Sequence, residues 1–195
     1  MSTMNALLRR AIDSGANPSG ESEQTIFAPI GFMTDGAVAP ERQDLSYVND
    51  NYPRIPVASF DSSVIETLHG NFPMPPSWDG GDFAVQFVWA SPSSGSVVWR
   101  FSTFSTPIVD EGRWGNAFNV TVDSVDAALD NGVLYINYGA WSQVALGTPA
   151  AGTKRFLAFS VQRRATDGAD THSGDAHLIG VNIRYRASSL SDKEA

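Results

Sequence analysis

Residues 83–101 read FAVQFVWASPSSGSVVWRF, and this stretch decides the fold. Large apolar side chains occupy every second position from Phe83 to Trp89, and a period of two places them on one face of a β-strand. The alternation resumes at Val97, Trp99 and Phe101 after a Ser, Pro and Gly connection typical of a hairpin. The pattern therefore predicts two paired strands whose tryptophans, Trp89 and Trp99, lie in the core.

Further strands are expected toward the C-terminus at 118–122, 133–138, 156–163 and 177–186, with one short helix at 124–129. The last strand alternates along its length and predicts one inward face, made by His177, Ile179, Val181, Ile183 and Tyr185. Six or more strands joined by turn-rich loops indicate an all-β protein, an antiparallel jelly-roll-like β-sandwich.

The N-terminal half is less regular. Extended segments are predicted at 25–32, 55–60 and 64–69, and prolines between them favour edge strands and surface loops. Residues 4–12 carry apolar side chains at helical spacing, which predicts a short helix and an assembly arm made by Met4, Leu7, Leu8 and Ile12. We expect an arm and linker at 1–24, a Pro-rich segment packing on the sandwich at 25–76, the sandwich core at 77–186 and a tail at 187–195.

Composition limits the classes of partner. The formal net charge is −8 and no basic cluster follows a phosphate backbone, so we expect no nucleic-acid partner. The chain has no cysteine, which excludes disulfides and thiolate metal sites. No apolar run reaches the roughly 18 residues of a membrane span, so we expect no membrane partner and synthesis in the cytoplasm.

No nucleophile or nucleotide-binding motif is present, so the sequence favours a protein that is not an enzyme and takes no cofactor. The three histidines are His69, His172 and His177, and we interpret His177 as a strand histidine bonded to a neighbour. Four carboxylates would permit glycosidase chemistry if two of them faced each other across a groove, namely Asp79, Asp82, Asp110 and Glu111. The turn-like sequence at 79–82, DGGD, favours a structural role for Asp79 and Asp82.

Residues 167–175 form an oxygen-rich loop containing Asp167, Asp170 and Asp175. Their spacing fits no EF-hand, and a turn in which the carboxylates accept backbone amide bonds is the favoured interpretation, with a bound cation as the alternative. Trp114 and Trp141 stand in loop-like sequence, where aromatic side chains serve either as anchors over the core or as ligand or subunit contacts.

Several stretches together resemble a group of small tailed-bacteriophage virion proteins. They are MPPSWDGG at 74–81, VVW at 97–99, GTPAAG at 147–152, residues 156–164, ATDGADT at 165–171 and DAHLIGV at 175–181. The resemblance covers about residues 72–186 and leaves the N-terminal part outside it. It implies a jelly-roll-like sandwich that assembles as a homotrimer on the particle, and it carries over no catalytic residue.

From this resemblance and the arm, the sequence predicts a virion structural protein. A capsid decoration protein, of the cement or head-spike type, is the leading hypothesis, bound to the major capsid protein or another virion protein through residues 1–24. A tail or baseplate component and a host-glycan-binding, receptor-binding module are the alternatives. Long tail fibres show extended repeats, which this chain lacks.

Overall fold

The computed structural model describes residues 22–46, 54–107, 118, 120–128, 134–146 and 155–187. The predicted arm residues Met4, Leu7, Leu8 and Ile12 lie outside this part of the chain, as does Trp114. In chain order the strands are β1 (Ser22–Pro29), β2 (Met33–Asp35), β3 (Glu41–Leu45), β4 (Ile55–Phe60), β5 (Thr67–Pro73), β6 (Trp78–Ser91), β7 (Ser96–Pro107), β8 (Val120–Ala127), β9 (Tyr135–Tyr138), β10 (Ser142–Val144), β11 (Arg155–Arg163) and β12 (Ala176–Ala187). A single 3-10 turn, η1 (Ile30–Phe32), joins β1 to β2.

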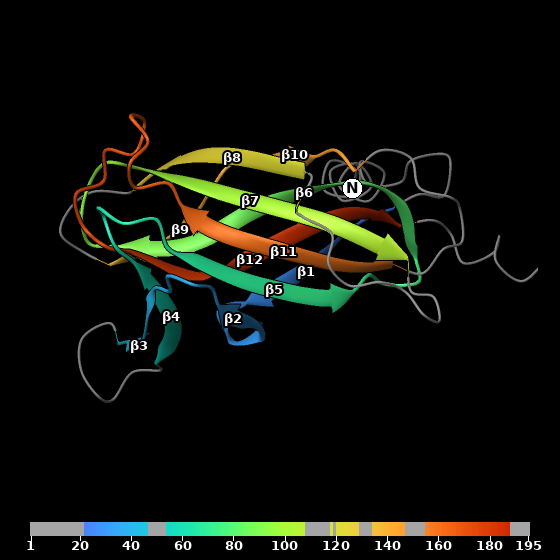
Figure 1. The fold of residues 1–195 in the computed structure, drawn as a ribbon, viewed down its shortest axis with the longest axis horizontal. Helices are drawn as coiled ribbons and strands as arrows, with labels where there is room; N and C mark the ends of the chain where they lie inside the picture. The colour runs from blue at the N-terminus through green and yellow to red at the C-terminus, as the bar shows by residue number, and fades with distance from the viewer. Residues whose placement is uncertain are drawn as a thin grey trace, which may run out of the picture.

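These strands form two antiparallel sheets that pack face to face, with β5, β11, β7 and β8 in one layer and β1, β12 and β6 in the other (Figure 1). The seven-stranded sheet has the order β10-β6-β12-β4-β3, with β9 beside β6 and β1 beside β12. The five-stranded sheet has the order β2-β5-β11-β7-β8. The predicted all-β sandwich is confirmed, and residues 25–76 contribute strands to both sheets.

The core lies between the sheets and is rich in aromatic rings. Trp89 of β6 and Trp99 of β7 are both 0% exposed, and their ring centroids lie 6.0 Å apart. Phe87 stacks on Trp99 at 5.6 Å, and Phe60 meets the same indole edge-on at 5.2 Å. The inward assignment of both tryptophans is therefore confirmed. The predicted pairing of their strands through a hairpin is wrong, because β6 and β7 belong to different sheets and face each other across the core.

The inward face of β12 differs from the prediction because of a β-bulge. Leu178 pairs with Trp89 and Gly180 pairs with Val88, so Ile179 is an extra residue with no place in the ladder. The core side chains are consequently Leu178 before the bulge and Val181, Ile183 and Tyr185 after it. His177 and Ile179 were assigned wrongly to the inward face, since one extra residue reverses the alternation.

Residues 124–127, predicted to begin a short helix, belong to strand β8. This strand pairs with β7 over its whole length, and Ser124 stands opposite Trp99 while Asp126 stands opposite Val97. Ser124 and Asp126 are therefore turned toward the core, and Val125 between them is 55% exposed. Pairing with the buried strand β7 outweighs the weak local helical preference of this stretch.

Candidate functional site

The outer face of the seven-stranded sheet brings together side chains from four strands. Gln86 of β6 stands opposite Asn182 of β12, which in turn stands opposite Phe27 of β1. In the next row, Tyr138 of β9 stands opposite Val88 of β6. Residues directly opposite each other in an antiparallel pair point to the same side of the sheet, so these side chains share one surface.

Two exposed aromatic rings border this surface. Tyr138 is 67% exposed and Phe27 is 46% exposed, although each stands on a strand of a well-packed sheet. Phe27 lies over Gly180, because a Cβ atom built on residue 180 would come within 2.6 Å of the ring. The glycine therefore allows the phenyl ring to lie close against the sheet instead of standing away from it.

Trp141 lies at the same surface, just before β10. The guanidinium carbon of Arg184 is 4.4 Å from the centroid of the Trp141 ring, a cation–π contact. Arg184 belongs to the outward set of β12, and it also lies 3.6 Å from the carboxylate of Glu23. Of the two predicted contact aromatics, Trp141 is thus brought to a surface with other exposed rings.

The centre of the surface is polar. The Nδ2 of Asn182 donates to Oε1 of Gln86 at 3.0 Å, and the Nε2 of Gln86 donates to the carbonyl oxygen of Gly139 at 2.8 Å. Both side chains are half-buried and fixed by these bonds. We call this surface the aromatic face, and it consists of Phe27, Gln86, Tyr138, Trp141, Asn182 and Arg184.

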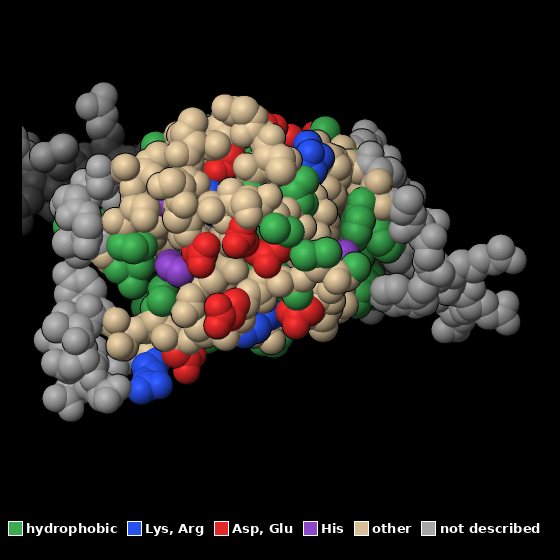
Figure 2. Space-filling view, turned by 60° about the vertical axis from the view of Figure 1, so that its left-hand side comes forward, with side chains coloured by type: hydrophobic (Ala, Val, Ile, Leu, Met, Phe, Trp, Pro, Cys, Tyr) green, Lys and Arg blue, Asp and Glu red, His purple; other side chains and the backbone are tan. Residues whose placement is uncertain are grey.

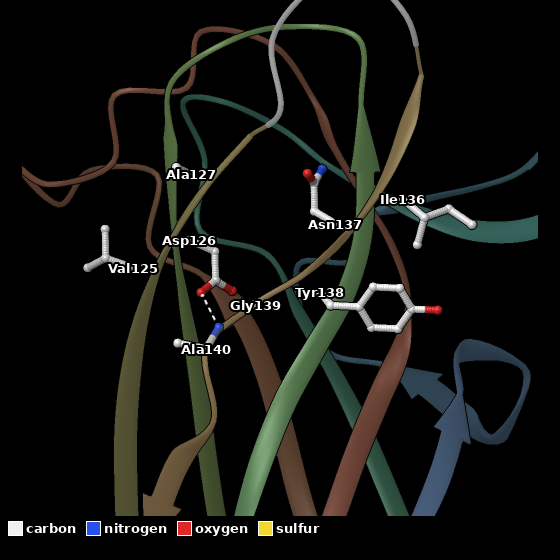
Figure 3. Close-up of a pocket in the computed structure, with 8 residues that line it drawn as sticks. All are labelled: Val125, Asp126, Ala127, Ile136, Asn137, Tyr138, Gly139 and Ala140. Atoms are coloured by element: carbon white, nitrogen blue, oxygen red, sulfur yellow. Dashed lines mark hydrogen bonds between the residues drawn. The ribbon is translucent and has the colours of Figure 1, made fainter. Parts of the chain in front are cut away.

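A pocket of about 410 Å³ opens beside the aromatic face, between the edge strands β8 and β9. Asp126 and Asn137 line it, and Val125 points away from it on one side while Ile136 and Tyr138 point away on the other (Figure 3). Oδ1 of Asp126 accepts hydrogen bonds from Ser124 Oγ at 2.9 Å and from the Ala140 amide at 3.1 Å. Burial raises the pKa of this carboxyl group, and the two hydrogen bonds offset only part of that effect.

The carboxylates of the 167–175 loop have structural partners. Asp170 forms a buried ion pair with Arg163, whose NH2 atom lies 2.9 Å from Asp170 Oδ1. Arg163 also donates to the carbonyl oxygens of Phe60, Gly174 and His172. Asp167 accepts the Ala169 amide at 3.0 Å, which is the turn role favoured above. Among the described residues, no group of three or more His, Asp or Glu side chains could hold a metal ion.

All three histidines form hydrogen bonds or ring contacts with other residues of the sandwich. His172 is 2% exposed and its two ring nitrogens contact Ser91 Oγ and the Ser94 carbonyl oxygen, each at 2.8 Å. Nδ1 of His177 lies 2.7 Å from Ser59 Oγ, as expected of a strand histidine with a bonded neighbour. Burial lowers the pKa of His177, the nearby Asp175 charge partly opposing this. His69 stacks on Phe118 at 6.0 Å.

Of the four carboxylates considered for glycoside cleavage, Asp79 and Asp82 are described and each accepts a backbone amide. Asp79 Oδ1 accepts the Gly81 amide at 2.8 Å, and Asp82 Oδ1 accepts the Leu146 amide at 3.0 Å. Asp110 and Glu111 lie outside the described residues. Asp79 and Asp82 therefore stabilise the backbone at the irregular start of β6, where Gly80 adopts a φ of 85°.

Acidic side chains gather on the end of the sandwich that is turned forward in Figure 2. Glu66 interacts with Asp61 and Asp175, since burial first and then these two negative charges raise the pKa of Glu66. The Asp61 amide donates to Glu66 Oε2 at 2.7 Å.

In the described part of the chain no helix is long and apolar enough for a membrane crossing.

No protein-family model matches this chain, and no curated protein matches it. Among solved structures, the chain is similar to the CBM22-2 xylan-binding domain of Xyn10C from Paenibacillus barcinonensis, with 13% identity and a TM-score of 0.43 over 82% of this chain and 98% of that one. It is also similar to the CBM35 module from the same organism, with 12% identity and a TM-score of 0.39 over 82% and 97%.

A phage protein is among the similar structures. The enzymatically active domain of tailspike protein 4 from Bacteriophage CBA120 is 13% identical with a TM-score of 0.34, over 86% of this chain and 19% of that one. These likenesses agree with a two-sheet β fold and carry nothing further.

Sequence reasoning identified Trp141 but missed Phe27, Gln86, Tyr138 and Asn182. All four stand on strands, and their exposure depends on which strands are neighbours in the sheet. One signal was available, because β9 reads YINY, with apolar and aromatic side chains on both sides of an asparagine.

Proposed function

We propose that this chain is a glycan-binding β-sandwich module and that the aromatic face is its binding surface. Sugar rings present apolar C–H faces together with hydroxyl groups. A surface that binds them needs exposed aromatic rings beside fixed hydrogen-bonding groups. The aromatic face offers both kinds of group on one sheet.

The observation that carries the proposal is the exposure of Tyr138 and Phe27 on either side of a polar pair. The Tyr138 ring is 67% exposed and shares one surface with Phe27 and Trp141, and exposed apolar groups gathered on one surface mark interaction sites. Between the two rings, the Gln86 and Asn182 amides are held by the bonds described above. Within the described part of the chain, Asn182 Oδ1 has no hydrogen-bond donor, so this acceptor can receive a ligand hydroxyl.

Rigidity of the platform supports the same function. Phe27, Gln86, Tyr138 and Asn182 all stand on strands, and strands hold side chains more precisely than loops do. Trp141 is restrained by the Arg184 guanidinium over its ring. Little conformational entropy would therefore be lost when a ligand binds.

A glycan array followed by titration calorimetry with the best ligand tests this proposal. Tyr138→Ala should weaken binding by about two- to tenfold, because a stacked aromatic ring contributes about 0.5–1.5 kcal/mol to a contact. Phe32→Ala is the matched control, since Phe32 is 77% exposed on the η1 turn and does not belong to the aromatic face. Binding that is equal in the wild type and Tyr138→Ala would remove the aromatic face as the site.

The virion role predicted from the sequence stays a prediction. Attachment to a capsid depends on the arm at 1–24, most of which lies outside the described residues. Deleting residues 1–20 should abolish incorporation into particles if that arm is the attachment module. Light scattering would test the predicted homotrimer, because the monomer mass is 20.9 kDa. A glycan-binding surface on a particle-bound trimer would be compatible with both proposals.

A further inference from the structure

Arg184 is the charged residue of the aromatic face, and its guanidinium lies at the surface of the protein. The side chain is 31% exposed, and its Cζ atom lies 4.4 Å from the centroid of the Trp141 ring. An arginine that contacts an aromatic ring in this way still presents a planar, rigid set of N–H donors. That set matches the two oxygens of a carboxylate better than any other side chain does.

The N–H donors of Arg184 are not used inside the described part of the protein. Its acidic partner is Glu23 at the start of β1, and the nearest atoms of the two side chains, Arg184 NH1 and Glu23 Oε2, are 3.6 Å apart. That separation is longer than a hydrogen bond, and the Glu23 side chain is 70% exposed. Among the described residues Arg184 makes no hydrogen bond, so its donors are available to a ligand.

Three other arginines show what a structural role looks like in this chain, because each donates hydrogen bonds to a carboxylate. Arg42 donates to Asp35 at 2.8 Å, Arg100 donates to Asp123 at 2.6 and 2.7 Å, and Arg163 donates to Asp170 at 2.9 Å. Arg184 differs from all three, since it has an acidic neighbour without such a bond. A second carboxylate can therefore occupy its donors without breaking a hydrogen bond of the described fold.

Arg184 stands close to the polar centre of the aromatic face. It follows Asn182 by two residues on β12, so both side chains lie on the outer side of the sheet, about 7 Å apart along the strand. Asn182 Oδ1 is the acceptor left open beside Gln86. A sugar ring with a carboxylate at its edge can donate a hydroxyl to Asn182 while the carboxylate meets the guanidinium.

The charge of the whole chain works against acidic ligands, so attraction has to come from a local cation. The formal net charge is −8, and such a chain does not attract anions from a distance. Arg186 follows Arg184 by two residues and is exposed on the same side of β12. Charges are screened beyond about 8 Å at physiological ionic strength, so these two arginines act on a ligand that already lies on the aromatic face.

We propose that the ligand of the aromatic face is an acidic glycan, whose sugar carboxylate binds the Arg184 guanidinium in place of Glu23. This inference rests on the proposed function and names its ligand class. The carboxylate accepts two parallel N–H···O bonds from the guanidinium, which a single hydroxyl group cannot do. Displacing Glu23 costs little, because an exposed ion pair without a hydrogen bond contributes little to stability.

Titration calorimetry at pH 7 with two matched pairs of probes tests this inference. Tetragalacturonic acid and sialyllactose are each compared with their methyl esters, which keep the sugar rings and remove the charge of a carboxylate that is ionised at this pH. In at least one pair the acid should bind at least about fivefold more tightly than the ester, and the preference should shrink in about 1 M salt. The pair that shows the preference identifies the sugar acid. Equal or weaker binding of the acid in both pairs would overturn the inference.

Two variants should change the preference in opposite directions. Arg184→Gln removes the guanidinium, so the preference for the acid should fall below about twofold. Glu23→Gln removes the competing carboxylate, so the acid should bind more tightly while the ester binds as before. Arg100→Gln is the matched control, because it removes the same charge from β7 of the other sheet and should leave the preference unchanged.

The variants also distinguish carboxylate binding from a purely structural role of Arg184. If the guanidinium only restrains Trp141, Arg184→Gln should weaken acid and ester equally, and that result would overturn the inference. Esters or neutral glycans that bind as tightly as the acids would keep the aromatic face as a binding surface and remove only the preference for charge. Absence of binding by every glycan tested would remove the proposed function together with this inference.

Discussion

The phenyl ring of Phe27 lies directly over Gly180, so close that a Cβ atom on residue 180 would be 2.6 Å from its Cζ atom. The same Cβ would be 2.6 Å from the carbonyl oxygen of Ala28, which belongs to the backbone of β1. Both the pairing of β1 with β12 and the position of the Phe27 ring therefore require a glycine at residue 180, whose side chain is a hydrogen atom.

Gly180→Ala should displace Phe27 and strain the β1–β12 ladder. Overpacking of a fitted site costs about 1–3 kcal/mol, and we expect that loss in the free energy of unfolding measured in urea. Glycan affinity should fall together with stability, because Phe27 borders the aromatic face. Gly168→Ala is the control, since a Cβ there meets nothing within 4 Å. Equal stability of both variants would show that β1 moves without cost.

Asp170→Ala should be strongly destabilising. The side chains of Arg163 and Asp170 are 0% and 1% exposed, so removing the carboxylate leaves a buried guanidinium without its counter-charge. Breaking such a pair costs about 3–5 kcal/mol. Asp35→Ala removes the partner of Arg42 in a pair that is 32% and 53% exposed, and it should cost less than about 1 kcal/mol. Comparable losses in the two variants, measured by chemical unfolding, would contradict this contrast.

Two substitutions of Trp89 separate the contribution of side-chain volume to stability from that of hydrogen bonding. Trp89→Ala should cost about 3–5 kcal/mol through lost burial and the cavity it leaves. The indole Nε1 of Trp89 has no hydrogen-bond partner among the described residues, so Trp89→Phe should lose volume alone and cost clearly less. Melting temperatures of the two variants measure the difference. Equal losses would indicate an acceptor for the indole that the described residues do not provide.

Asp126 and Asp123 should give opposite pH dependences of stability, although both stand on β8. The raised pKa of Asp126 means that the folded state holds a proton after the unfolded chain has lost it, so stability falls as pH rises from 3.8 through the folded-state pKa. Hydrogen bonding to Arg100 lowers the pKa of Asp123, so its contribution is present above pH 3.8 and is lost as pH falls further.

The measurement is the unfolding free energy from pH 3 to pH 7 for the wild type and two variants. In Asp126→Asn, the part of the unfolding free energy that declines with rising pH should be absent. In Asp123→Asn, the part that is lost at low pH should be absent. A wild-type minus Asp126→Asn difference that stays constant over this range would show that the Asp126 carboxyl titrates normally.

Alternation in the sequence predicted the sandwich and its central strands because the inward faces of β6 and β7 are uniformly apolar. It failed at Ile179, since a bulge is set by how two strands fit and not by either strand alone. Alternation also failed to predict the strand at 124–127, because two polar residues, Ser124 and Asp126, occupy its inward positions, where apolar side chains are expected. Three short strands, β2, β3 and β10, were also missed, because β2 and β10 have only three residues each and β3 reads ERQDL, with no alternation of apolar and polar side chains.

The candidate site was predictable only in part. Trp141 stood out as a loop aromatic, and the structure places it on the aromatic face. Phe27 and Tyr138 are on strands far apart in the chain, and only the pairing order β9-β6-β12-β1 brings them to one surface. The Asp126 pocket likewise depends on two strands of different sheets, a relationship that no local pattern records.

The pairing of β1 with β12 sets Ser22 opposite Ala187, so the first and last of the described strands are hydrogen-bonded neighbours. With residues 1–21 and 188–195 removed, Ser22 and Ala187 could be joined by a short linker without moving either strand. New termini opened in the loop from Pro92 to Gly95, which joins β6 of one sheet to β7 of the other, would then leave every strand pairing intact. The fold is therefore a candidate for circular permutation, in which the order of the strands along the chain changes while the order across each sheet does not.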